Sequence, residues 1–270
     1  VQWNGADRST IFLTPTQLTA SITAADLSTA GTAAVTVTSP APGGGISNAA
    51  DFVINNPVPT LTSISPTSKT AGDAAFVLTV NGTNFLNNSS VRVNGTDRPT
   101  TFVNSTQLTA QLIAADVQAA GTFPVTVFNP GPGGGTSNAI NLAVNNPVPT
   151  LSSISPTTKI VGDAAFTLTV NGTGFVNGAV VRFNGSNRST AFVNSTQLTA
   201  QITAADVQNA GTFPITVFNP APGGGTSNAV NLAVNNPSPS LTSISPTSKN
   251  AGDAAFTLTV NGGNFISSSV

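Results

Sequence analysis

The sequence repeats itself every 90 residues, and this period constrains the fold more than any other feature. The segment Pro-Val-Pro-Thr-Leu-Thr-Ser-Ile-Ser-Pro begins at Pro57, and close copies begin at Pro147 and Pro237. Two complete repeats therefore occupy 57–146 and 147–236. Propeller blades repeat at only about 40 to 50 residues, so each unit here is long enough to be a small domain.

The chain begins and ends inside a repeat. Residues 1–56 match the C-terminal part of a module and 237–270 match the N-terminal part, so the two together contain every segment of one complete repeat. A partial sandwich cannot bury its apolar face alone, and we expect both ends to need a partner. Either the polypeptide continues covalently, or 237–270 of one subunit completes the sandwich begun by 1–56 of the next through β-strand addition.

The predicted contact between subunits is apolar. A donated strand would bury the alternating row Phe256, Leu258 and Val260, and each large side chain that is fully buried contributes about 1.5–3 kcal/mol. Trp3 occupies the strand position held by Val93 and Phe183 in the other repeats, so we interpret it as a core residue and not as a platform for stacking sugars. The contact is predicted to comprise Phe256, Leu258, Val260, Val270, Val1 and Trp3.

Within each repeat the apolar residues alternate as they do in β-strands. In the third segment the alternating rows are Phe166, Leu168 and Val170; Val181 and Phe183; Leu198, Ala200 and Ile202; Phe213, Ile215 and Val217; and Val230, Leu232 and Val234, with an opening strand at Leu151 to Ser155. Six or seven such strands per repeat are typical of an immunoglobulin-like sandwich.

Turns and joints separate these strands. Asn171-Gly172 and Asn184-Gly185 tolerate positive φ, and Ala204 to Ala210 predicts a single helical turn between strands. The Asn-Asn-Pro-Val-Pro joint at 145–149 and its counterparts at 55–59 and 235–239 are short, and proline stiffens them. We therefore predict an all-β fold of tandem immunoglobulin-like β-sandwiches of 90 residues each, arranged as a rod.

Three segments of each repeat resemble the IPT/TIG family. They are Pro-x-Pro-x-Leu-x-Ser-Ile-Ser-Pro, then Ala-Gly-Asp-Ala-Ala-Phe-x-Leu-Thr-Val-Asn-Gly-x-x-Phe, then Val-Arg-x-Asn-Gly, and the resemblance covers the whole chain. It implies an immunoglobulin-like fold of the kind found in arrays on bacterial surface proteins. Family membership alone assigns no chemistry.

Charge is scarce, which argues against a nucleic-acid partner. Charged residues make up 6% of the chain and the net charge is −1. Nucleic-acid binding requires clustered Lys and Arg, so we expect no nucleic-acid partner. No apolar run reaches the roughly 20 residues of a membrane helix, and low net charge makes self-association easier.

The residue types that carry most chemistry are missing. The chain has no His, Cys, Tyr, Met or Glu, which removes the commonest general bases, thiol nucleophiles and soft metal ligands. We expect no enzyme activity, no catalytic residue, no metal and no cofactor. Asp73, Asp163 and Asp253 are interpreted as turn residues or weak ion-pair partners and not as calcium ligands, and Asp26, Asp116 and Asp206 as helix-capping residues.

These observations favour a structural role. The leading hypothesis is a subunit or repeat window of an extracellular or cell-surface filament, which polymerises head to tail with copies of itself. The alternative is an adhesin array that binds a glycan or a receptor and gains avidity from its repeats. Near-identical repeats favour a shaft over a binding tip.

Overall fold

The computed structural model describes all 270 residues and consists almost entirely of β-strands. It contains two compact units, Val1–Asn145 and Asn146–Val270. Each unit holds one complete module and one partial module. No helix in the chain is long and apolar enough to cross a membrane.

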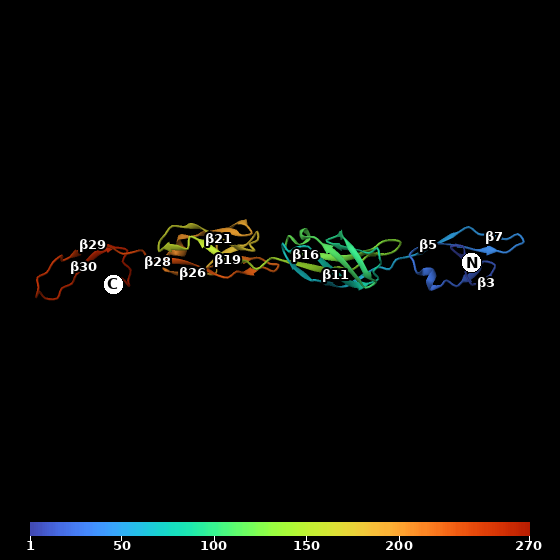
Figure 1. Cartoon of the computed structure of the whole chain (residues 1–270), viewed down its shortest axis with the longest axis horizontal. Helices are drawn as coiled ribbons and strands as arrows, with labels where there is room; N and C mark the ends of the chain where they lie inside the picture. The colour runs from blue at the N-terminus through green and yellow to red at the C-terminus, as the bar shows by residue number, and fades with distance from the viewer. The chain divides into compact units, whose positions relative to one another are not determined.

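The complete module of the first unit is a two-layered sandwich. One sheet has the strand order β14-β15-β11-β9 and the other β10-β18-β16-β12-β13, with β17 paired to β16. The green part of Figure 1 shows β11 and β16 in different layers. Its elements are β9 (Thr60–Ser65), β10 (Ser68–Thr70), β11 (Phe76–Thr83), β12 (Ser90–Val93), β13 (Thr96–Arg98), β14 (Thr100–Asn104), β15 (Gln107–Leu112), the 3-10 helix η2 (Ala114–Val117), β16 (Gly121–Asn129), β17 (Gly135–Thr136) and β18 (Ile140–Asn145).

Strand pairing explains why the module holds together over its whole length. All ladders are antiparallel except that of β10, which pairs in parallel with β18. A bulge at Asn81 and Gly82 shifts the register between β11 and β9. Gly82 is required there, because a Cβ would lie 1.9 Å from the carbonyl oxygen of Thr60 and 2.6 Å from the Phe85 ring.

The core lies between the two sheets and is formed by the alternating apolar rows. Apolar side chains that point inward interdigitate, as expected for two packed sheets. The buried cluster comprises Leu61, Ile64, Leu78, Val80, Phe85, Val91, Val93, Leu108, Ala110, Leu112, Val125, Val127 and Leu142.

The complete module of the second unit repeats this architecture. Its sheets are β19-β21-β25-β24 and β20-β28-β26-β22-β23, with β27 paired to β26. Its elements are β19 (Thr150–Ser155), β20 (Thr158–Ile160), β21 (Phe166–Thr173), β22 (Val180–Phe183), β23 (Ser186–Asn187), β24 (Thr190–Asn194), β25 (Gln197–Ile202), η3 (Ala204–Val207), β26 (Gly211–Asn219), β27 (Gly225–Thr226) and β28 (Val230–Asn235).

The predicted sandwich and the predicted helical turn are confirmed, but the strand count is wrong. Each complete module has ten strands, not six or seven. The additional ones are short edge or hairpin strands such as β23 and β27, of two residues each, which lack an apolar alternation to reveal them.

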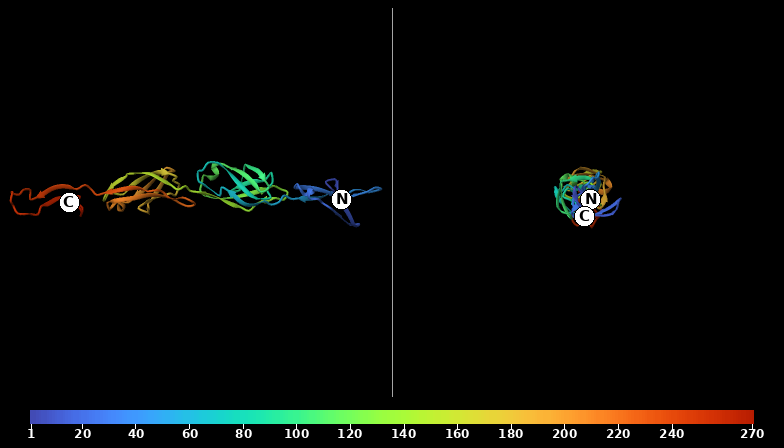
Figure 2. Two further views of the ribbon diagram at one scale, coloured as in Figure 1. Left: turned by 60° about the horizontal axis from the view of Figure 1, so that its bottom comes forward. Right: turned by 90° about the vertical axis from the view of Figure 1, so that its right-hand side faces the viewer.

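The partial modules retain only part of the sandwich. In 1–56, one sheet has the order β2-β1-β5-β8, and two separate hairpins are formed by β3-β4 and β6-β7. Its elements are β1 (Gln2–Trp3), β2 (Ala6–Asp7), β3 (Thr10–Thr14), β4 (Gln17–Ala20), η1 (Ala24–Leu27), β5 (Gly31–Thr36), β6 (Thr38–Ser39), β7 (Gly45–Ile46) and β8 (Ala50–Ile54). In 237–270 only the hairpin of β29 (Ser240–Ser245) and β30 (Thr259–Gly263) is present, and Figure 2 shows it as a single layer.

Candidate functional site

The apolar row of 237–270 lies open to solvent. Phe256, Leu258 and Val260 are 51%, 45% and 46% exposed. The corresponding residues of the complete module, Leu168 and Val170, are fully buried. Three of the six side chains predicted as a contact surface therefore form an exposed apolar row.

Missing neighbours explain this exposure. In the complete module β21 pairs on one side with β19 and on the other with β25. The corresponding strand β30 pairs only with β29, and it starts at Thr259, although β21 starts at Phe166, the equivalent of Phe256. The first apolar residues of the row thus lie outside the strand, because the strand that would pair with them is absent.

We refer to six exposed apolar residues of 237–270 as the donor face: Leu241, Ile244, Phe256, Leu258, Val260 and Phe265. The sequence analysis did not single out Leu241 and Ile244 of β29 or Phe265, whose counterparts Leu151, Ile154 and Phe175 are 2%, 4% and 2% exposed. The two large apolar side chains of the opening strand were a signal for Leu241 and Ile244. The predicted contact residue Val270 is also exposed, at the end of the chain.

The segment 1–56 carries a second exposed apolar surface, here named the acceptor face. Leu27 and Phe52 are 47% and 48% exposed, whereas their counterparts in the first complete module, Val117 and Leu142, are fully buried. Trp3 differs from these residues. It is only 4% exposed and packs on Phe52 at a ring-centroid distance of 5.1 Å. The interpretation of Trp3 as a core residue is therefore confirmed.

The two faces divide residues that form one core in a complete module. In 147–236 a single buried cluster joins residues of 151–179, which correspond to the donor face, with residues of 181–234, which correspond to 1–54. Val1 and Trp3 are the counterparts of Val181 and Phe183 in that cluster. Within the chain, the structure places Val1 and Trp3 in the first unit and the donor face in the second.

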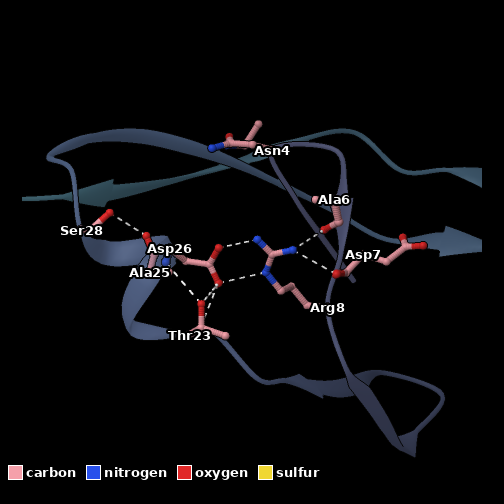
Figure 3. Close-up of polar contacts among 9 residues, drawn as sticks. Asn4, Ala6, Asp7, Arg8, Thr23, Ala25, Asp26 and Ser28 are labelled. Atoms are coloured by element: carbon pink, nitrogen blue, oxygen red, sulfur yellow. Dashed lines mark hydrogen bonds and ion pairs between the residues drawn. The ribbon is translucent and has the colours of Figure 1, made fainter.

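A partly buried ion pair recurs in 1–56 and in both complete modules, and it fixes the 3-10 turn. In Figure 3 the Arg8 guanidinium lies against both carboxylate oxygens of Asp26, with Nε donating to Oδ2 at 3.0 Å. Asp26 also accepts a hydrogen bond from the backbone N–H of Thr23 at 2.9 Å. Arg8, followed by the Thr23 backbone, lowers the pKa of Asp26 well below its usual range. The predicted capping role of Asp26 is confirmed, and its Arg partner was missed because 18 residues separate them.

The aspartates of the Gly-Asp-Ala-Ala loop serve as turn residues, as predicted. Asp73 accepts a hydrogen bond from the backbone N–H of Thr70 at 3.0 Å and pairs with Lys69 at 3.0 Å. Lys69 lies over the Phe76 ring, 5.0 Å from its centroid, and is half-buried. No group of three His, Cys, Asp or Glu residues that could hold a metal ion occurs in the chain.

A buried asparagine links three segments of each complete module, and sequence reasoning missed it. Asn129 is fully buried, and its amide donates to the carbonyl oxygens of Pro57 and Asn84 at 2.9 and 2.8 Å. Ser89 donates to its side-chain oxygen. The Pro57 contact holds the start of the module against the end of its longest strand, β16.

The fold and its repeating contacts define a tandem array of immunoglobulin-like β-sandwiches. The model of the IPT/TIG domain matches residues 59–144 and 149–234, which together exceed half of the chain. The protein belongs to the IPT/TIG domain family, as its repeated segments predicted. No curated protein matches the chain as a whole.

Several solved structures match part of the chain. A crystal structure with xylogluco-oligosaccharide matches 78% of this chain at 21% identity and a TM-score of 0.39, and the Yersinia pseudotuberculosis adhesin InvE matches 66% at 20% identity and a TM-score of 0.41. The plexin A4 extracellular region matches 72% at 17% identity and a TM-score of 0.29. This chain covers 48%, 58% and 16% of those three chains, respectively.

Proposed function

We propose that this chain is a structural subunit, or a repeat window, of an extracellular or cell-surface filament. Its partial modules are completed head to tail by the neighbouring unit, either through strand donation or through covalent continuation. Its partners are copies of itself, and it has no catalytic role. The observation that supports the proposal best is the exposure of the donor face, whose counterparts are buried in both complete modules, except that those of Phe256 are half-buried.

The two faces are chemically matched. The donor face presents Leu258 and Val260, and the same residue types at the same positions, Leu168 and Val170, are fully buried in 147–236. Burying a large aliphatic side chain stabilises an assembly by about 1.5–3 kcal/mol. Several such side chains are enough to offset the entropy lost when two subunits associate, which is about 4–15 kcal/mol.

The arrangement of the faces favours a filament over a closed oligomer. The donor and acceptor faces are different surfaces at opposite ends of the sequence, so a contact between them is heterologous. A heterologous contact leaves one donor face and one acceptor face free after each addition. It therefore continues to add subunits unless the rotation between them closes a ring.

Sedimentation velocity over a range of concentrations tests the proposal. We expect the chain to form long oligomers, Leu258→Asp to remain monomeric, and Thr257→Asp to assemble normally. Thr257 is the matched control, because its counterpart Thr167 is exposed in the complete module. Deletion of 237–270 has the same expected effect as Leu258→Asp.

Two outcomes would contradict the proposal. If polymers still form after deletion of 237–270, strand donation is wrong. If the intact chain stays monomeric at all concentrations and binds glycans on an array, the adhesin alternative replaces the filament. The mass of the denatured subunit of native filaments distinguishes units of 26.9 kDa from a longer continuous polypeptide.

A further inference from the structure

In each complete module, one loop binds the asparagine of the joint that precedes the module. The backbone N–H of Asn56 donates to the carbonyl oxygen of Pro132 at 2.7 Å, its amide side chain donates to that of Pro130 at 2.8 Å, and Gly134 donates to its carbonyl oxygen at 2.8 Å. The loop 130–135 therefore holds Asn56 through three hydrogen bonds.

The second complete module repeats these contacts. Asn146 donates to Pro222 at 2.8 Å from its backbone and to Pro220 at 2.9 Å from its side chain, and it accepts from Gly224 at 2.9 Å. A parallel bridge pairs Asn146 with Gly223, as another pairs Asn56 with Gly133. The joint asparagine and its loop thus form a recurring binding unit.

A second polar contact accompanies the first. The side chain of Asn138 accepts from the backbone N–H of Leu61 at 2.9 Å and donates to the carbonyl oxygen of the same residue at 2.9 Å. Asn228 clamps Leu151 in the same way, at 2.9 and 2.8 Å. In each module a carboxamide from the C-terminal part holds the first strand in register.

Each partial module carries one half of these contacts, and the matching groups lie in the other partial module. The third joint asparagine, Asn236, is exposed and forms no side-chain hydrogen bond, whereas Asn56 and Asn146 are half-buried. The third copy of the loop, 40–45, is exposed along its whole length. Asn48, the counterpart of Asn138, is exposed and its side chain is unpaired, and Leu241, the residue it would clamp, is 65% exposed.

We infer that these groups form a polar lock between copies of the chain: Asn236 of one copy enters the loop 40–45 of a second copy, whose Asn48 clamps the backbone of Leu241. The inference rests on the proposed function and specifies how the joint is aligned. The apolar faces supply most of the affinity, but apolar burial is not directional and so does not fix how the strands align. The lock supplies the register, because a strand slipped by one residue turns every apolar side chain to the wrong face.

Gly43 provides a steric test of the lock. A Cβ on its counterpart Gly133 would lie 2.5 Å from the Asn55 Cβ and 2.8 Å from the Asn56 carbonyl oxygen, whereas a Cβ on Gly43 meets nothing within 4 Å in the free chain. Gly43→Ala therefore blocks the incoming joint without a clash in the free protein. Gly5→Ala is the matched control: Gly5 has a similar φ of +79° against +83°, and neither Gly5 nor its counterparts Gly95 and Gly185 has a neighbour within 4 Å.

The experiment is sedimentation equilibrium of the full chain and its variants. We expect Gly43→Ala to weaken self-association by tenfold or more, in rough proportion to lost hydrogen bonds, and Gly5→Ala to associate like the parent chain. Asn48→Ala, which adds no bulk and no backbone strain, is expected to weaken association by about tenfold. Circular dichroism checks that every variant keeps its folded modules.

The outcomes separate the two proposals. If the parent chain assembles and both Gly43→Ala and Asn48→Ala assemble with unchanged dissociation constants, the lock is wrong and the apolar head-to-tail contact stands. If the parent chain does not assemble, head-to-tail strand donation fails and the lock between copies falls with it. Selective weakening by these two variants, with Gly5→Ala unaffected, supports the lock.

Discussion

Residues 147–180 and 237–270 have the same apolar pattern but bury it to very different extents. Leu168 and Val170 are completely buried, whereas Leu258 and Val260 remain nearly half exposed. Both segments form the same first hairpin with the same bulge, β19 with β21 and β29 with β30. Local sequence is therefore sufficient for the hairpin, and the remaining strands of the sandwich, β25 and the facing strands β22, β26 and β28, complete the burial in one segment only.

The comparison predicts opposite consequences for one substitution at the two sites. Leu168→Ala removes a fully buried side chain, and we expect it to destabilise the module 147–236 by about 2–5 kcal/mol. Leu258→Ala is expected to leave the stability of the dilute chain nearly unchanged and to weaken self-association. Hydrogen exchange of strands β21 and β30, followed by mass spectrometry below the association concentration, measures the effect of each substitution on stability. Sedimentation velocity measures the effect on self-association. Equal losses of protection at both sites would show that the hairpin 237–270 already has a core of its own.

The side chains of Asn228 and Asn48 allow a second comparison between a complete and a partial module, with a smaller expected effect on stability. Asn228→Ala leaves the backbone N–H and carbonyl oxygen of buried Leu151 without their side-chain partner, and we expect a loss of about 1–3 kcal/mol from the module 147–236. Asn48→Ala in the partial module breaks no hydrogen bond within the chain, so the free energy of unfolding should not change. Urea denaturation of the two variants at low concentration checks this, and a loss for Asn48→Ala as large as for Asn228→Ala would contradict it.

The strands of the sandwich were predictable because each has a local signature. Rows such as Leu198, Ala200 and Ile202 alternate over β25, and Asp206 lies in the predicted helical turn, where it accepts a hydrogen bond from the backbone N–H of Thr203. The apolar row of the donor face was also predictable, since Phe256, Leu258 and Val260 alternate along the sequence. These features depend on residues that are close together in the sequence.

The features that escaped sequence analysis depend on residues far apart. The clamp of Asn228 on Leu151 spans 77 residues, and the buried Asn219 bonds to Pro147 across 72. An asparagine in a chain rich in Asn, Ser and Thr carries no sign that distinguishes a buried linker from a turn residue. Only the packing of the first strand against the last ones reveals which asparagines are structural.

The two complete modules differ at one buried contact, and this allows a stabilising substitution. Ser89 donates to the side-chain oxygen of Asn129, but the module 147–236 has Ala179 at the equivalent position, and the side-chain oxygen of Asn219 has no partner. We expect Ala179→Ser to stabilise the module 147–236 by roughly 1 kcal/mol, and Ser89→Ala to destabilise the module 57–146 by a similar amount. Differential scanning calorimetry measures both, and a destabilising Ala179→Ser would mean that the added hydroxyl is not accommodated.

The smallest expected effect concerns acid stability and again separates a complete module from a partial one. Asp163 accepts a hydrogen bond from the backbone N–H of Ile160 and pairs with Lys159 at 2.9 Å, and these contacts lower the pKa of Asp163 from its ordinary value of 3.8. A lowered pKa in the folded state means that the contribution to stability is present above pH 3.8 and is lost as the pH falls through the lowered value.

Asp163→Asn should therefore slightly flatten the loss of thermal stability of the module 147–236 below about pH 4, and salt should reduce the difference because the pair is partly exposed. In the partial module Asp253 accepts from the backbone N–H of Asn250 at 2.8 Å, but Lys249 is exposed and forms no ion pair with it. Asp253→Asn is the matched control and should leave the melting curve of the complete modules unchanged. Thermal melts of both variants between pH 2 and pH 6 test this, and a steeper acid transition for Asp163→Asn would reverse the assigned sign.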